Sequence, residues 1–142
     1  MKLWIVGRTI PDSIKSLTRD PDVLFDEENS ARPASELFQE AAVLLAPIRV
    51  GGGTSYKILE SMACGTPVVT TSLSANAIKA NDEKELMVGQ TAQGLAEKTI
   101  KILQDNELYE KISRNGRKLI EEKYTWKSIA KELETVYKNL IS

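Results

Sequence analysis

The sequence contains no histidine and a single cysteine, Cys64, among its 142 residues. Without histidine, a general base or catalytic triad built on imidazole is excluded, as is any zinc site that needs histidine ligands. A lone cysteine forms neither an intrachain disulfide nor a multi-thiolate metal site, so no metal is expected. No other cofactor is expected. One cysteine also suits a reducing compartment, and we expect a cytoplasmic protein.

Neither sign of charge dominates, because 19 Lys and Arg stand against 20 Asp and Glu, a formal charge of -1. General nucleic-acid or anionic-membrane binders need a basic excess, so no nucleic-acid partner is expected and membrane contact is not indicated. Long apolar runs are also lacking: none approaches the roughly 18 to 20 residues of a membrane span. The apolar stretch at residues 3–6 is too short for a signal peptide.

The length and composition are those of one soluble globular domain. Hydrophobic residues make up 42% and charged residues 27% of the chain, far from the composition of disordered proteins. No internal repeat, linker or low-complexity tract marks a boundary. We therefore expect a single domain over residues 1–142.

The first half of the chain alternates short β-rich runs with helical periods, which is a βαβ pattern. Its strands are apolar at consecutive positions, as in a parallel sheet buried on both faces by helices. The sequence predicts an α/β fold of three layers, α/β/α, with a mostly parallel sheet of about five strands. The expected strands are residues 3–6, 23–25, 43–46, 67–71 and 85–88, and the expected helices are residues 11–17, 33–42 and 54–63.

The rest of the chain is predicted to be helical, with Thr91, Asp105 and Thr125 as N-caps of three successive helices. The last helix carries one apolar stripe that must dock on another surface. Large aromatic residues such as Trp126 are expected to pack in a core. The stripe consists of Trp126, Ile129, Ala130, Leu133, Val136, Tyr137, Leu140 and Ile141.

Three consecutive glycines, Gly51, Gly52 and Gly53, join a buried strand to a helix. Such a turn at the carboxyl end of a parallel strand lets backbone amides approach a phosphate or diphosphate, and Thr54 and Ser55 add hydroxyl donors. The pattern matches neither the Walker loop nor the dinucleotide fingerprint, so a simple tight connection stays open as an alternative.

Three charged residues have both a functional and a plain interpretation. Lys57 and Glu60 share a helical face: they either form a surface ion pair, or place Lys57 near phosphates and Glu60 on the two hydroxyls of a ribose. Arg8 follows the first strand at its carboxyl end, where it either approaches a phosphate or base or is simply solvated.

The segment that follows these glycines resembles the donor-binding segment of glycosyltransferase family 4 (group 1), retaining enzymes of the GT-B fold. The resemblance rests on Lys57-Ile-Leu-Glu60-Ser-Met-Ala-Cys64-Gly65-Thr-Pro67-Val-Val, preceded by Ala46-Pro47 and the glycines. Weaker agreement extends over nearly the whole chain, at residues 3–7, 36–42, 115–117 and 124–126.

The resemblance implies a Rossmann-like, nucleotide-sugar-binding domain, the C-terminal half of a GT-B enzyme, and a hexosyltransferase that assembles polysaccharide or glycoconjugates. Glu60 matches the glutamate that holds the ribose, and is the best candidate for a catalytic residue. Transfer in this family is electrostatic, with the diphosphate stabilised as it departs and no protein nucleophile or metal. The implied donor-binding set is Arg8, Gly51, Gly52, Gly53, Thr54, Ser55, Tyr56, Lys57 and Glu60.

Three departures from the family pattern qualify these implications. Gly52 stands where the family has the first of two paired glutamates, which leaves the sugar open. The family's first strand, its phosphate-binding Arg and Lys, and the N-terminal acceptor domain have no counterpart, so we expect the isolated chain to be inactive and to need an N-terminal domain or chain as partner. Self-association through the last helix is a further expectation. A non-catalytic nucleotide-binding or interaction module is the alternative function.

Overall fold

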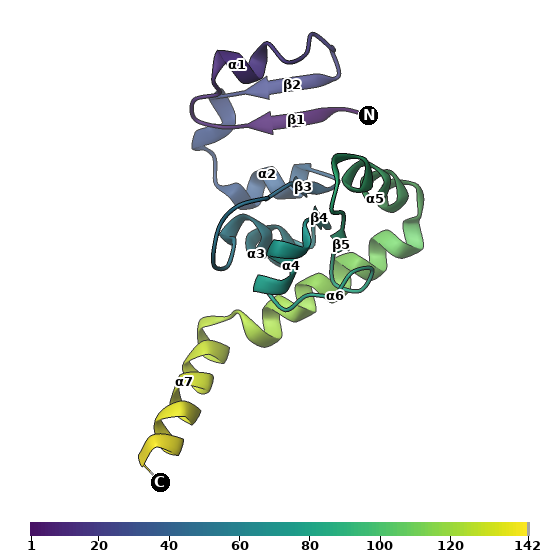
Figure 1. Ribbon diagram of the computed structural model, residues 1–142. Coiled ribbons are helices and arrows are strands. Elements are labelled where there is room, and N and C mark those ends of the chain that lie inside the picture. Colours follow the sequence, from purple (N-terminus) through teal and green to yellow (C-terminus); the bar gives the residue numbers. More distant parts are fainter. Residues whose placement is uncertain (142) are drawn as a thin grey trace. The chain divides into compact units, whose positions relative to one another are not determined.

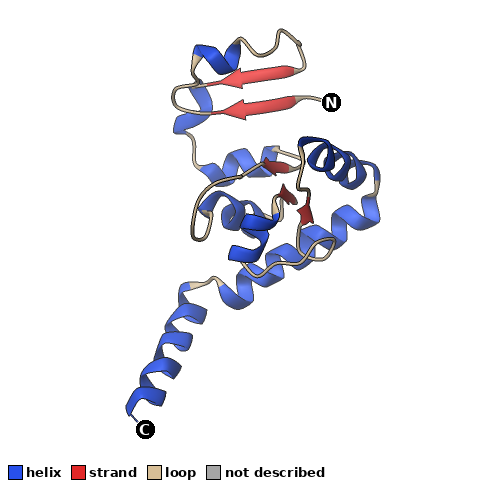
Figure 2. Cartoon of the chain, viewed as in Figure 1, coloured by secondary structure: helices blue, strands red, loops and turns tan. Residues whose placement is uncertain are grey.

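The computed structural model describes residues 1–141, and the chain divides into two compact units with the boundary after Pro33. We call residues 1–33 unit 1 and the remainder unit 2. Strands and helices alternate in both units, as the ribbon and the secondary-structure colouring show (Figures 1 and 2). The α/β class is therefore confirmed. Each unit has its own sheet, and the single domain expected over residues 1–142 stays a prediction.

Unit 1 is a small βαβ unit. Its strands β1 (Leu3–Val6) and β2 (Val23–Asp26) pair in parallel, from Leu3 opposite Val23 to Val6 opposite Asp26. The helix α1 (Asp12–Lys15) connects them, and the 3₁₀ helix η1 (Glu28–Ala31) follows. The indole of Trp4 donates a 2.8 Å hydrogen bond to the Asp26 carboxylate, which joins the two strands through their side chains.

Unit 2 contains a three-stranded parallel sheet in the order β3-β4-β5, formed by Leu44–Ala46, Val68–Thr70 and Met87–Val88. Helices precede, connect and follow these strands (Figure 1). They are α2 (Ala34–Glu40), α3 (Tyr56–Ala63), α4 (Ser72–Ala77), α5 (Ala92–Gln104), α6 (Asn106–Lys123) and α7 (Trp126–Ile141).

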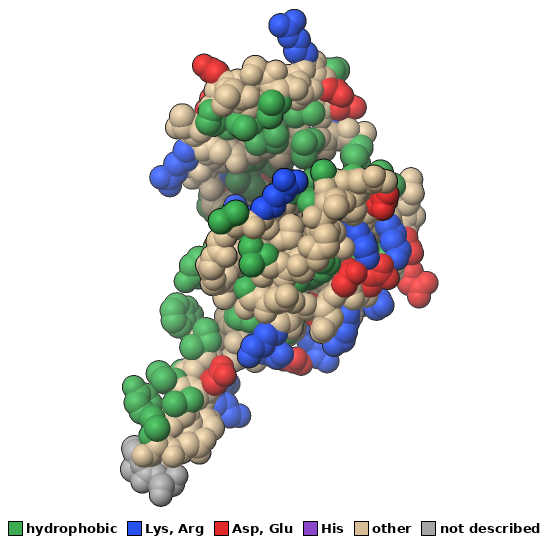
Figure 3. Space-filling view, viewed as in Figure 1, with side chains coloured by type: hydrophobic (Ala, Val, Ile, Leu, Met, Phe, Trp, Pro, Cys, Tyr) green, Lys and Arg blue, Asp and Glu red, His purple; other side chains and the backbone are tan. Residues whose placement is uncertain are grey.

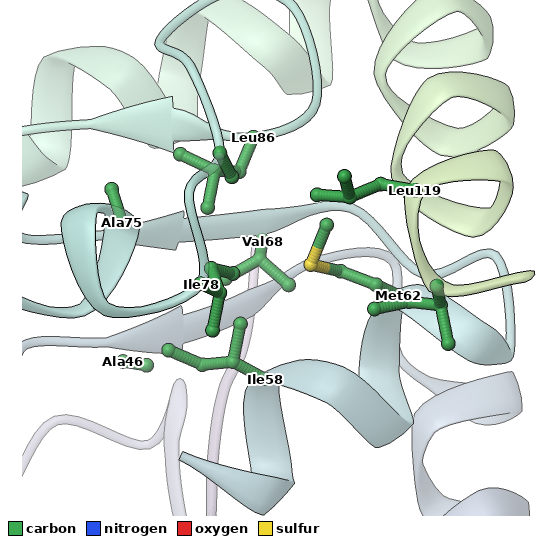
Figure 4. Close-up of a cluster of buried hydrophobic side chains, with 10 residues drawn as sticks. Ala46, Ile58, Met62, Val68, Ala75, Ile78, Leu86 and Leu119 are labelled. Carbon is green, nitrogen blue, oxygen red and sulfur yellow. The ribbon is translucent and has the colours of Figure 1, made fainter. Parts of the chain in front are cut away.

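The central strand β4 is buried on both faces, which confirms the expectation drawn from its consecutive valines. Val68 belongs to one apolar cluster with Ile58 and Met62 of α3, and Val69 belongs to a second cluster with Leu95 and other residues of α5 and α6. Figure 4 shows the first cluster, with α3 packed against the sheet. Helices thus cover both faces, and the loop that leads into α3 rests on a packed core.

The five strands do not form the single sheet that the sequence predicts. Among residues 1–141, β1 pairs only with β2, and β3 pairs only with β4. No strand of the described chain pairs with both β1 and β3.

Smaller corrections concern helices and side chains. The sequence predicts no helix between residues 71 and 85, but the helix α4 (Ser72–Ala77) begins directly after β4, with Thr71 as its N-cap. The helices expected at 11–17 and 33–42 are shorter, at Asp12–Lys15 and Ala34–Glu40. By contrast, the caps are confirmed: Thr91 accepts from Gly94 N–H, Asp105 from Leu108 N–H and Thr125 from Ser128 N–H.

The stripe of α7 is not in a core. Trp126 is 88% exposed, so its expected packing is wrong, and Leu133 and Leu140 are also exposed. Hydrophobic side chains gather along one side of this helix in Figure 3. The apolar stripe is therefore present on α7, but no described residue covers it. The side chain of Ile141, which the stripe includes, lies outside the described residues.

Candidate functional site

The predicted site lies where β3 ends and α3 begins, at the carboxyl edge of the unit 2 sheet. Residues 47–55 form this connection, and the ends of β4 and β5 lie beside it because all three strands are parallel. Ligands of open α/β sheets bind at this edge. The structure therefore places the glycine loop where the sequence predicts it.

Two of the three glycines adopt backbone angles that favour glycine. Gly51 has φ +145° and Gly53 has φ +81°, both in the region that L side chains rarely adopt. Gly52 does not, and a Cβ there would meet no atom within 4 Å. The loop conformation thus depends on Gly51 and Gly53, whereas the backbone around Gly52 is open to a ligand.

The helix α3 begins directly after this loop, and no side chain caps its amino end. Ser55 is the N-cap residue, but its side chain makes no capping hydrogen bond. Within the described chain, the backbone N–H groups of Tyr56 and Lys57 have no acceptor, since the first bonds run from Ile58 and Leu59 to the Ser55 carbonyl. Unpaired N–H groups at a helix start attract anions. The positive end of α3 is available for a phosphate.

Lys57 and Glu60 are exposed on α3, while Ile58, Ser61 and Met62 face the core. No ion pair joins Lys57 to Glu60 among residues 1–141, so the plain interpretation of this pair is wrong. Both charged groups are thus free to meet a ligand. Because the opposite face of α3 is buried, the side chains of Lys57 and Glu60 point away from the core.

The remaining predicted residues have different settings. Tyr56 is 79% exposed, Thr54 is exposed and Ser55 is half-buried, so all three are accessible beside the loop. Arg8 is exposed after β1 in unit 1, and its part in the site stays a prediction. The structure therefore brings together the residues from Gly51 to Glu60.

Two threonines that the sequence analysis did not single out hold this loop. Thr70 Oγ1 donates a 2.7 Å hydrogen bond to the Ala46 carbonyl, and Thr71 Oγ1 donates a 2.5 Å hydrogen bond to the Ile48 carbonyl. The signal in the sequence was the pair of hydroxyls at the end of an apolar strand. Beyond them, the side chains of Ser72 and Gln90 meet at 3.2 Å, from the ends of β4 and β5.

A metal site, a membrane-spanning helix and a further hollow are other features that the described residues could provide. Among them, no group of three or more Asp, Glu or Cys side chains is arranged to hold a metal ion. Within residues 1–141, no helix has the length and apolar character to cross a membrane. A hollow of about 680 Å³ lies between the start of α7 and its neighbours, lined by Lys79, Lys123, Lys127 and Lys131 among others, and includes none of the predicted site residues.

Comparisons with known proteins identify the family of the chain. A family model described as Glycosyl transferases group 1 matches residues 1–105. The capsular polysaccharide biosynthesis glycosyltransferase CapM of Staphylococcus aureus is 32% identical over 88% of this chain and 33% of its own length. N-acetyl-alpha-D-glucosaminyl L-malate synthase of Bacillus anthracis is 31% identical over 99% of this chain and 38% of its own length.

Solved structures share the fold at low sequence identity. Sucrose-phosphate synthase of Thermosynechococcus elongatus superposes with a TM-score of 0.77 at 22% identity, over 99% of this chain and 38% of its own. The C-terminal domain of LpcC, a glycosyl transferase group 1 family protein of Francisella tularensis, gives 0.65 at 21% identity, over 81% of this chain and 60% of its own.

The match thus extends from the motif around Glu60 to most of the chain. The chain spans about a third of the length of the curated relatives named above. Its fold is that of the Rossmann-like GT-B domains among the solved structures. The chain belongs to the glycosyl transferases group 1 family.

Proposed function

We propose that this chain forms the donor-binding part of a retaining glycosyltransferase that transfers a hexose from a nucleotide-diphosphate sugar. One observation carries the proposal: an open glycine loop meets the uncapped amino end of α3, with Lys57 and Glu60 free beside it. Amides and a lysine suit a diphosphate, and a carboxylate suits the two hydroxyls of a ribose. These groups occur together on one short segment.

The proposed role of each group follows from its chemistry. As the bond between sugar and diphosphate breaks, negative charge grows on the leaving diphosphate, and the amides of the loop and of α3 stabilise it together with Lys57. Glu60 holds the donor by accepting hydrogen bonds from the ribose. No metal held by this chain and no covalent intermediate enters the proposal.

The relatives support sugar transfer as the reaction class, because one is named for capsular polysaccharide biosynthesis and others as glycosyltransferases or synthases. Their names refer to different products, so they do not identify the acceptor for this chain. We propose that the acceptor is bound by a further domain or chain that completes the active site. The alternative of a non-catalytic binding module gains no support from these relatives.

Calorimetric titration of the chain with UDP, GDP and ADP tests the proposal. We expect saturable binding of one of these nucleotides, and a loss of affinity of at least tenfold, about 1.4 kcal/mol, in Glu60→Ala. The matched control is Glu110→Ala, which removes an exposed carboxylate from α6. Binding that both variants weaken equally, or no binding of any nucleotide, would contradict a donor site in this chain.

A further inference from the structure

The glycine loop has few internal constraints. Within residues 1–141, no hydrogen bond is donated by the backbone of residues 49–57, and Val50 is 90% exposed. The loop is therefore held mainly at its two ends. One end is Ser55, whose carbonyl accepts the first bonds of α3, and the other is the turn at Ala46, Pro47 and Ile48.

That turn is fastened to the end of β4. Ile48 N–H donates to the Ala46 carbonyl at 2.8 Å, which closes a tight turn around Pro47. The Thr70 and Thr71 hydroxyls then donate to the two carbonyls of the same turn, at Ala46 and Ile48. Both threonines are buried, with exposed fractions of 0% and 6%. Their hydroxyls are thus shielded from water, and these bonds are costly to leave unmade.

Thr71 occupies a position where a threonine hydroxyl ordinarily caps a helix. It is the N-cap residue of α4, where a threonine oxygen usually accepts from a backbone N–H of the helix. In this structure it makes no such capping bond, and its hydroxyl is directed at Ile48 instead. The bond from Thr71 therefore serves the loop rather than its own helix.

We propose that Thr71 is a positioning residue of the donor site: its hydroxyl fixes the Ile48 carbonyl, and with it the direction in which the glycine loop leaves the sheet. Thr70 fixes the preceding carbonyl of the same turn. This inference rests on the proposed function, since the loop is the part that meets the donor. Amides that bind an anion must be held in place before it arrives, because ordering them on binding costs affinity.

Three variants test the inference. Thr71→Val keeps the shape and removes the hydroxyl, whereas Thr71→Ser keeps the hydroxyl. Thr66→Val is the matched control, because Thr66 is also buried, at 5%, and donates a 2.7 Å bond to the Phe38 carbonyl, but just before the amino end of β4. Thermal melts should establish that all variants fold, and Thr66→Val should measure the effect of losing one buried hydroxyl by itself.

Nucleotide affinity is the first readout. We expect Thr71→Val to bind the nucleotide that the wild type binds at least tenfold more weakly, with Thr71→Ser and Thr66→Val within about threefold of the wild type. Equal affinity in Thr71→Val, or an equal loss in Thr66→Val, would overturn the positioning role.

Backbone ¹⁵N order parameters of residues 48–51 are the second readout, and they need no ligand. We expect them to fall in Thr71→Val toward values typical of flexible backbone, below about 0.6, and to stay unchanged in Thr66→Val. If the wild type binds no nucleotide, the proposed function fails for this chain, while the order parameters still decide the role of Thr71. Unchanged values in Thr71→Val would overturn it.

Discussion

Gly89 lies so close to Leu95 that a Cβ on the glycine would come within 2.5 Å of the Leu95 backbone nitrogen. The same Cβ would meet the carbonyl carbon of Gly94 at 2.7 Å. Gly89 follows β5, and Leu95 lies in the first turns of α5, so this contact sets how closely the helix approaches the carboxyl edge of the sheet. The atoms concerned are backbone and cannot rotate away.

We expect Gly89→Ala to lower the free energy of unfolding by about 1–3 kcal/mol, the usual cost of overpacking. Urea denaturation followed by circular dichroism measures this loss. The matched control is Gly52→Ala, where the added methyl meets no atom within 4 Å and the stability should stay within about 0.5 kcal/mol of the wild type. An equally stable Gly89→Ala protein would contradict the close approach.

Gly53→Ala should weaken nucleotide binding more than Gly52→Ala. At φ +81° an alanine is strained by about 1–2 kcal/mol, so the loop shifts to relieve it. Alanine at Gly52 adds no such strain, because that position has no left-handed angle. Calorimetric titration of the two variants with the nucleotide that the wild type binds gives the comparison. Equal affinities would show that the loop adopts a different conformation in solution.

Glu83 should contribute stability that acid removes. Hydrogen bonds from the ammonium groups of Lys101 at 2.7 Å and Lys98 at 2.8 Å lower the pKa of Glu83 from 4.5 to about 2. Since the pKa is lower in the folded than in the unfolded chain, the contribution is complete above about pH 5 and is lost as the pH falls toward 2.

The Glu83 side chain is 43% exposed, so solvent screens these pairs and each is worth about 0.2–1 kcal/mol. Glu83→Gln should therefore lose less stability than the wild type between about pH 6 and pH 3. Thermal melts at both pH values measure the difference, and Glu110→Gln on α6 is the control. Identical acid losses in wild type and Glu83→Gln would refute the contribution.

The position of the glycine loop and of α3 could be predicted from the sequence because their residues are contiguous, while their role as a donor site stays a prediction. The segment from Gly51 to Glu60 is one loop and one helix, so its local pattern also fixes its geometry. Thr71 was not predicted as a site residue, because its bond to Ile48 joins positions 23 residues apart, and strand pairing alone brings them together. The part of Arg8 in the site stays a prediction, because Arg8 lies in unit 1 and the glycine loop lies in unit 2.

The fold was predicted in part. The burial of β4 and the capping residues were predicted correctly, because consecutive valines and side-chain oxygens such as that of Thr91 act locally. The expected burial of β1 and β2 is wrong, since neither strand contains a fully buried residue. The number of sheets was predicted wrongly, because the apolar patterns of β1 and β3 indicate strands without showing which strand lies beside each. Trp126 was placed in a core for a related reason: periodicity shows that a helix has an apolar face but not what covers it.

The exposed face of α7 should make the chain self-associate. Lys127, Lys131 and Ser128 of this helix line the hollow that it shares with Lys79, so its polar side faces its own unit. Its apolar side, with Leu133 52% exposed, faces solvent. Large exposed apolar patches mark interaction surfaces. Sedimentation velocity over a range of concentrations should therefore show dimers or larger species.

Leu133→Lys should shift this equilibrium toward the monomer, because a charge in the apolar stripe must be desolvated when two copies meet. Lys131→Gln is the control, since Lys131 lies on the side that lines the hollow and its loss leaves the stripe intact. Circular dichroism of both variants should show the helix content of the wild type. A wild type that sediments as a monomer at every concentration would contradict self-association through α7, and association that persists in Leu133→Lys would place the contact on another surface.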